Sequence, residues 1–154
     1  MNSFPGEIIR VTFPLEQDED GYPPYSEEGI LVRELSEVAG EVLSIPFFVV
    51  GVSRGDLITY SRGDGEEYIF DELVSARGHS TIRVILFEEG EEDRLVADLK
   101  RTGCEVERGG VPSMLAIDVP PAVGYSSVME VVQLGAEQEL WDYEESCIAI
   151  EHRS

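Results

Sequence analysis

The first half of the chain has the pattern of short β-strands. Apolar and polar residues alternate over residues 7–13, which places Ile9, Val11 and Phe13 on one face of a strand. Further strands are predicted over residues 30–35, 41–52, 57–60 and 68–74. The second of these, EVLSIPFFVVGV, is too apolar for an exposed strand, so we expect it at the centre of a sheet. Short strands joined by tight turns predict a curved antiparallel sheet or partial barrel.

The second half alternates strands with helices. A strand over residues 81–87 places Ile82, Val84 and Leu86 on one side. A helix follows from residue 91, with acids in its first turn and bases in its last, and Gly103 ends it. The remaining predictions are strands over 104–108, 115–119 and 141–150 and a second helix that starts at Ser127 with capping-box spacing. The order β-α-β-β-α-β predicts a ferredoxin-like motif.

Together the two halves predict an α+β fold. We expect a curved amino-terminal β-rich subdomain, residues 1–76, packed on a ferredoxin-like subdomain, residues 77–154. The strand face that carries Arg83, Ile85 and Phe87 is too apolar for open water. It therefore packs on the amino-terminal half or on a second copy of the chain, which makes a homodimer the alternative arrangement.

The net charge of the chain limits which kinds of molecule it can bind. The chain of 154 residues has 32 acids and 11 bases, a net charge of −21, spread over both halves. Such a field repels nucleic acid and anionic membranes, and it accelerates association with basic proteins. The start, MNSFPGEIIR, lacks the pattern of a signal peptide, and no apolar run has the ~20 residues of a spanning helix. We expect a cytoplasmic protein with free thiols at Cys104 and Cys147.

One acidic stretch has the spacing of a calcium-binding EF-hand loop. In EQDEDGYPPYSE, residues 16–27, acids stand at positions one, three and five, glycine at six and glutamate at twelve. An EF-hand needs flanking helices, whereas a strand precedes this loop and Pro23 and Pro24 stiffen it. We therefore interpret it as a solvated acidic turn without a metal.

Other metal sites are not predicted either. The remaining candidate ligands, His79, Cys104, Cys147 and His152, lack the paired spacing of zinc sites. His152 also lies near the end of the chain, where we expect fraying. The sequence predicts no cofactor.

The segment Gly78-His79-Ser80-Thr81 is the candidate site for a small ligand. Glycine permits a tight turn, histidine titrates near neutrality, and the two hydroxyls can bind an anion. No acid in the sequence can be identified to orient a Ser–His pair for nucleophilic catalysis. The favoured interpretation is a turn whose polar groups cap the strand that follows.

Several sequence blocks resemble a known bacterial family. They are DEDGYPP at 18–24, IPFF at 45–48, Gly55-Asp56, GHSTIRV at 78–84, Gly103-Cys104 and WDYEE at 141–145. In this order they resemble a family known only as a domain of unknown function. The resemblance implies no assigned chemistry, cofactor or catalytic residue. It also implies small bacterial proteins, among them immunity partners of polymorphic toxins.

Two functional hypotheses follow. The first is a non-enzymatic binding protein, an immunity-type inhibitor whose acidic surface covers the basic active site of a toxin. Its expected contacts are Asp18, Glu19, Asp20, Tyr22 and Tyr25, supported by Glu144 and Glu145. The alternative is a ligand-sensing regulatory module whose ferredoxin-like, or ACT-like, half pairs with itself and binds a metabolite at residues 78–81.

Overall fold

A computed structural model describes residues 6–109 and 113–153 of the chain. It confirms a mixed α+β protein, with two α-helices and nine strands in the described residues. The chain divides into two compact units, Met1–Arg77 and Gly78–Ser154. The sequence-based division into subdomains 1–76 and 77–154 stays a prediction.

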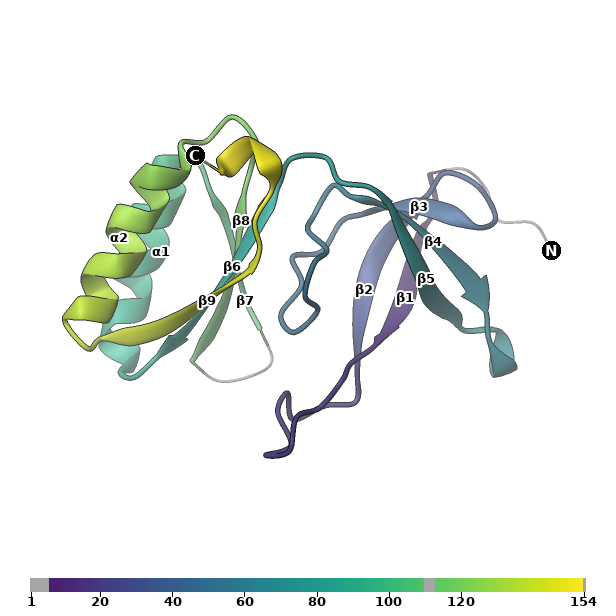
Figure 1. Cartoon of the computed structure of the whole chain (residues 1–154), viewed down its shortest axis with the longest axis horizontal. Helices are drawn as coiled ribbons and strands as arrows, with labels where there is room; N and C mark the ends of the chain where they lie inside the picture. Colours follow the sequence, from purple (N-terminus) through teal and green to yellow (C-terminus); the bar gives the residue numbers. More distant parts are fainter. Residues whose placement is uncertain (1–5, 110–112, 154) are drawn as a thin grey trace. The chain divides into compact units, whose positions relative to one another are not determined.

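The first unit is a five-stranded sheet that closes on itself (Figure 1). Its strands are β1 (Ile8–Pro14), β2 (Glu27–Glu34), β3 (Ala39–Val42), β4 (Leu57–Arg62) and β5 (Tyr68–Ser75). Consecutive strands pair antiparallel. The closing pair is parallel and joins β1 to β5 through Val11↔Tyr68 and Thr12↔Ile69. The predicted curved sheet is thus present, and it forms a closed barrel with one parallel seam.

The barrel interior confirms the predicted face of β1. Val11 and Phe13 are buried and Ile9 packs against the same core. Phe13 stacks on Phe70 of β5, with ring centroids 4.2 Å apart. The other buried members of this core are Ile30, Val32, Val42, Val49, Val52, Ile58 and Tyr60. The predicted face of β1 therefore packs into the core, while Thr12 on the other face is also buried.

The predicted central strand over residues 41–52 is wrong. β3 ends at Val42, and residues 43–56 contain no helix or strand. Four apolar side chains of this segment, Ile45, Phe48, Val49 and Val52, are nevertheless buried, whereas Val50 is exposed. Most of the run is therefore apolar because its side chains pack inward, while its backbone makes no ladder. Pro46 lacks the N–H that a central strand needs.

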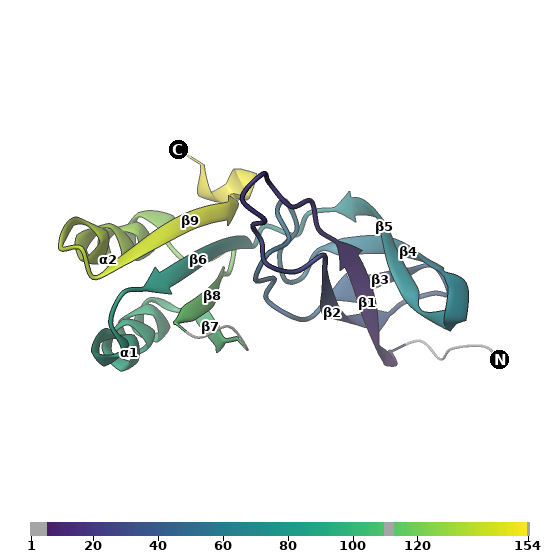
Figure 2. The same cartoon turned by 90° about the horizontal axis from the view of Figure 1, so that it is seen from below.

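The second unit is a four-stranded sheet covered by two helices. Its elements are β6 (Ser80–Leu86), α1 (Glu92–Thr102), β7 (Glu105–Arg108), β8 (Met114–Val119), α2 (Tyr125–Glu137) and β9 (Trp141–Cys147). The strand order is β7-β8-β6-β9, and every neighbouring pair is antiparallel. Figures 1 and 2 both draw α1 and α2 on the same face of this sheet. Short 3₁₀ turns occur at Asp64–Glu66, Glu89–Glu91 and Ile150–His152.

The helices cover the predicted apolar face of β6. Ile82, Val84 and Leu86 are buried in one core with the apolar stripe of α1. Gly103 ends α1 with φ +108°, a left-handed conformation that glycine adopts without strain. Neither helix in the described residues combines the length and apolarity that spanning a membrane requires.

Two boundaries differ from the prediction. α2 begins at Tyr125, and its N-cap, Gly124, makes no side-chain capping bond, so the capping box at Ser127 is wrong. β9 ends at Cys147 because the Ala149 N–H donates to the Ser80 hydroxyl, and the chain then turns into the Ile150–His152 helix.

Candidate functional site

The loop between β1 and β2 is held by its own hydrogen bonds. Asp18 Oδ1 accepts the N–H groups of Asp20 (2.9 Å) and Tyr22 (3.0 Å). The Asp18 N–H donates to the Tyr22 carbonyl (2.8 Å), and the Leu15 N–H at the loop base donates to the Ser26 carbonyl (2.8 Å). A short polar side chain that binds its own backbone is a common turn device. Asp18 therefore fixes the loop as well as carrying charge.

Two tyrosines of this loop pack on one phenylalanine of the 43–56 segment. The Tyr22 and Phe48 ring centroids are 6.2 Å apart with the planes at 74°, and those of Tyr25 and Phe48 are 5.6 Å apart at 54°. Phe48 is 8% exposed, whereas Tyr22 and Tyr25 are 41% and 49% exposed. We call Tyr22, Tyr25 and Phe48 the aromatic corner. Its inner ring is anchored while the outer two face solvent.

Glu28 fixes the backbone beneath the aromatic corner. Its carboxylate accepts the N–H groups of Phe47 (2.7 Å), Phe48 (2.9 Å) and Val49 (3.0 Å). Hydrogen bonds to an ionised acceptor are shorter and stronger than neutral ones. Sequence reasoning missed this residue because Glu28 stands among many acids, and its partners lie about twenty positions further along the chain.

The acids beside the aromatic corner face solvent. Glu16, Glu19 and Asp20 are exposed, and none of them makes an ion pair with a base of the described residues. Their charges are therefore not neutralised within the described part of the chain. The arrangement is a fixed aromatic surface in a negative field.

At the second candidate site, the structure brings His79 to an acid. His79 Nδ1 and Asp118 Oδ1 are 2.8 Å apart, so Nδ1 carries the proton and donates it to the carboxylate. Gly78 has φ +92°, and a Cβ there would press on Glu151 and Pro121. The tight turn predicted at this glycine is present.

Ser80 is engaged on both sides of its hydroxyl. Its Oγ accepts the Ala149 N–H (2.8 Å) and lies 2.6 Å from His152 Nδ1. His152 Nε2 lies 2.9 Å from the Pro120 carbonyl, which can only accept, so Nε2 carries the proton. When the ring is neutral, Nδ1 then accepts the Ser80 O–H. With the side chain fully buried, this serine fastens the chain end to β6.

Thr81 is also buried, in register with Asp118 of β8 and Cys147 of β9, and its carbonyl accepts the Ser146 hydroxyl (3.2 Å). Whether residues 78–81 bind a ligand stays a prediction. The geometry places the Ser80 and Thr81 side chains inside the fold rather than at a surface.

The expected fraying at His152 is wrong. Besides its two hydrogen bonds, the half-buried His152 ring stacks on Tyr125, with centroids 5.2 Å apart and planes at 22°. The Tyr125 O–H donates to Glu145 (2.7 Å), and burial, reinforced by that carboxylate, raises the pKa of Tyr125. These contacts attach the last turn to the body of the second unit.

Glu144 and Glu145 point in different directions. Glu144 lies 3.4 Å from Arg83 of β6, and Glu145 accepts from Tyr125 of α2. Neighbouring residues of a strand face opposite sides of its sheet. The two acids therefore do not form one surface with each other.

A polar cluster extends from the buried Glu34, through the half-buried Tyr68, to the exposed Arg62 of the barrel. Glu34 is 1% exposed and accepts the Tyr68 O–H (3.2 Å), while Arg62 donates to the Tyr68 oxygen (2.9 Å). The Tyr60 O–H lies within hydrogen-bond distance of the Ala39 carbonyl (2.9 Å). Burial, followed by the charge of Glu34, raises the pKa of Tyr60 to about 12. This phenol stays neutral at physiological pH.

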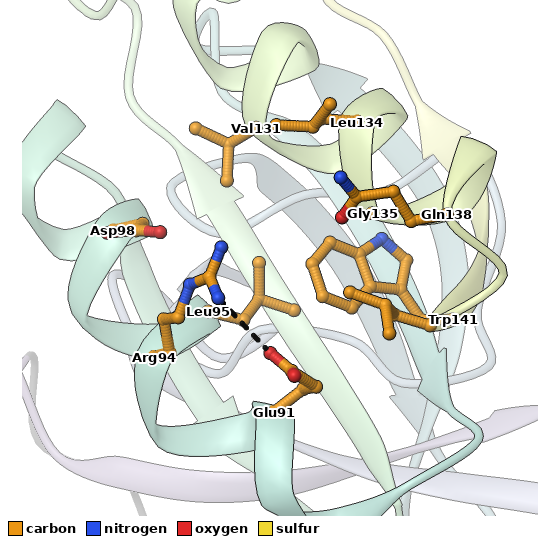
Figure 3. A pocket seen from close by; sticks show the side chains of 10 residues that line it. Glu91, Arg94, Leu95, Asp98, Val131, Leu134, Gly135, Gln138 and Trp141 are labelled. Atoms are coloured by element: carbon orange, nitrogen blue, oxygen red, sulfur yellow. Dashed lines mark ion pairs between the residues drawn. The ribbon is translucent and has the colours of Figure 1, made fainter.

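A shallow pocket lies between α1 and α2 (Figure 3). Leu95 and Trp141 line it, and the Glu91–Arg94 ion pair, 3.8 Å long, lies at its side. Its volume is about 80 Å³. Metabolite sites usually have several hundred Å³. The pocket fits a single small side chain.

The described residues contain no candidate metal site. Within residues 6–109 and 113–153, no group of three or more His, Cys, Asp or Glu side chains is arranged to hold a metal ion. Cys104 and Cys147 are free thiols, the first buried and the second half-buried. Burial raises the pKa of Cys104.

Comparison with known proteins identifies the family. The family model described as "Domain of unknown function (DUF4265)" matches residues 28–143, about three quarters of the chain. The chain belongs to this family. The match covers Glu28, Phe48 and residues 78–81, whereas the acidic loop at 16–27 and Glu144–Glu145 lie outside it.

One solved structure resembles the chain closely in fold. It is described as "Novel crystal structure of a hypothetical protein from Neisseria gonorrhoeae", with a TM-score of 0.79 at 20% identity. The likeness covers 94% of this chain and 97% of that one. At this identity it shows a shared fold. No protein of curated function matches the sequence.

Proposed function

We propose that this DUF4265 protein is a non-enzymatic acidic binding protein, an immunity-type inhibitor that covers the basic active site of a toxin. The observation that carries the proposal is the loop at residues 16–27, in which Glu16, Glu19 and Asp20 are exposed together with the half-exposed Tyr22 and Tyr25. Aromatic anchors inside a field of opposite charge are typical of tight protein interfaces.

Rigidity supports the same proposal. Asp18 fixes one side of the aromatic corner and Glu28 fixes the other. A surface that is already ordered loses less conformational entropy when it binds, and therefore binds more tightly. The net charge of −21 adds long-range attraction for a basic partner. The proposed site of action is the cytoplasm, where an inhibitor meets a toxin that has entered or is made there.

We propose a ferredoxin-like fold for the second unit. Its element order, β6-α1-β7-β8-α2-β9, and its strand order, β7-β8-β6-β9, support this assignment. In the proposed function this unit is a scaffold. Its polar residues Ser80 and His152 bind each other and Ala149, which supports a structural role over a ligand-sensing one.

The test pairs partner capture with a biological readout. The chain is used as bait in lysate of its native host, beside a Glu19→Lys/Asp20→Lys variant and a Glu88→Lys/Glu89→Lys control of equal charge. A basic protein that the first variant loses and the control retains supports the proposal if it is toxic alone and co-expression of this chain restores growth. If co-expression of this chain restores growth against none of the captured partners, the protein is not an inhibitor. Turnover of a small molecule that disappears in a His79→Ala variant contradicts a non-enzymatic protein.

A further inference from the structure

We infer that the aromatic corner is the seat for an arginine side chain of the basic partner. The inference rests on the proposed function and specifies the residue type that its central contact recognises. Tyr22 and Tyr25 both pack on Phe48, yet keep two fifths or more of their surface exposed. Ring surface presented to solvent attracts a cation through the negative faces of the rings.

Hydrogen bonds that a bound side chain leaves intact hold the backbone at Phe48 and Tyr22, two of the three residues of the aromatic corner. The backbone of Phe48 and its two neighbours is held by the Glu28 carboxylate. The Tyr22 backbone is held by Asp18 through its N–H and its carbonyl. Neither set of bonds involves the exposed parts of the rings. The seat is therefore formed before the partner arrives, and binding needs no rearrangement of these two loops.

Charge selects a cation, and geometry selects arginine among cations. Glu16, Glu19 and Asp20 are exposed in the same short loop as the two tyrosines. A guanidinium is planar, so it can stack on an aromatic ring while its N–H groups reach a carboxylate at the same time. A lysine ammonium is a compact, strongly hydrated charge. It cannot stack flat on a ring while it binds a carboxylate. The side chain that binds the aromatic corner is therefore an arginine.

The test uses the full chain and three peptide probes that differ only in the head group: hexaarginine, hexalysine and the neutral isostere hexacitrulline. Titration calorimetry at about 150 mM salt, where surface charges are screened beyond ~8 Å, measures each affinity. We expect hexaarginine to bind about two- to fivefold more tightly than hexalysine, and hexacitrulline more weakly than either. Aromatic ring signals of Tyr22 and Tyr25 should shift on addition of hexaarginine.

Variants locate the preference. Tyr25→Leu and Tyr22→Leu keep apolar bulk against Phe48 but remove a ring, so the arginine preference should fall to near unity while binding through charge persists. Phe87→Leu is the matched control, because Phe87 is an exposed ring, 60% accessible, beside Glu88 and Glu89. It should leave the preference unchanged. Two separate tyrosine variants keep the test usable if one of them fails to fold.

Three outcomes overturn the inference: equal affinity for arginine and lysine peptides, a preference that survives in both tyrosine variants, or no binding of any peptide. None of these affects toxin neutralisation, which is measured with the captured partner. Conversely, the Tyr25→Leu variant could lose the arginine preference while the chain neutralises no toxin. That result would support the arginine site and contradict the inhibitor function.

Discussion

The two candidate sites use similar side chains in opposite ways. In the loop at residues 16–27, exposed carboxylates and rings that face solvent lie in one short segment. At residues 78–81, the hydroxyl of Ser80 and the carbonyl of Thr81 bind groups of the same unit, and both side chains are buried. The first arrangement leaves interaction capacity for another molecule, whereas the second consumes it within the fold.

The comparison teaches that residue type alone does not locate a binding site. A Gly-His-Ser-Thr segment has more reactive side chains than an acidic turn. The hydroxyl of its serine, however, is already hydrogen-bonded to Ala149 and His152. An acidic turn is ordinary in composition, yet Asp18 gives it a fixed shape, and Glu28 holds the backbone of Phe48, on which its tyrosines pack. Single substitutions should separate residues that hold the fold from residues that face a partner.

The largest effect is expected at Glu28. Glu28→Ala removes the acceptor of three backbone N–H groups, so the free energy of unfolding should fall by about 3 kcal/mol in urea denaturation. Glu27→Ala is the control, because Glu27 is an exposed acid next to it, and its effect should stay within about 0.5 kcal/mol. Equal effects of the two substitutions would show that Glu28 is an ordinary surface acid.

Ser80 should come next. Ser80→Ala leaves the buried Ala149 N–H without its acceptor and removes the hydroxyl from His152. The free energy of unfolding should fall by about 2 kcal/mol, while affinity for the partner stays the same. The exposed Ser126 of α2 provides the control variant, Ser126→Ala, with little expected change. A stable Ser80→Ala protein that loses partner binding would reverse the roles of the two sites.

Asp18 allows its structural and charge contributions to be separated. Asp18→Ala removes the acceptor for the Asp20 and Tyr22 N–H groups, so stability should fall by about 1 kcal/mol. Asp18→Asn keeps an acceptor oxygen and removes only the charge, so stability should change by less than about 0.5 kcal/mol. Thermal and urea denaturation of the pair measure this. Equal losses in both would mean that charge, and not the turn, orders the loop.

Tyr60 should affect the pH dependence of stability at alkaline pH. Between its ordinary pKa of 10.0 and its folded pKa of about 12, the unfolded chain has lost the phenol proton and the folded chain retains it. Unfolding in this interval releases about one proton, so the stability that the buried phenol contributes at lower pH is lost as pH rises through the interval, whereas below it Tyr60 adds no pH dependence. Denaturation of Tyr60→Phe against pH should show a shallower alkaline decline. An identical slope would contradict the buried, neutral phenol.

Much of the fold follows from local pattern. The α1 helix, with bases in its last turn and Gly103 at its end, and the alternating face of β1 depend on interactions a few residues apart, which periodicity reports. The failures have non-local causes. Residues 43–56 are apolar like a central strand, but Glu28, about twenty positions earlier, takes their backbone N–H groups.

The candidate site likewise has features that the local sequence predicts and features that depend on distant residues. The stiff acidic loop could be predicted, because Asp, Gly and Pro at this spacing are turn residues. The aromatic corner could not, because it depends on Phe48 meeting Tyr22 and Tyr25 from another part of the chain. The ordered position of His152 could not be predicted either, because its partner Ser80 lies 72 positions away in the sequence.

The central claim is that the loop at residues 16–27, and not the overall charge, recognises a basic partner. The most direct measurement is the association rate constant of the captured partner, in a surface-binding assay over a range of salt, with two variants of equal net charge. Glu19→Lys/Asp20→Lys should lower the rate about tenfold and flatten its salt dependence, whereas Glu88→Lys/Glu89→Lys should leave both close to those of the unmodified chain. Equal losses in the two variants would contradict the claim.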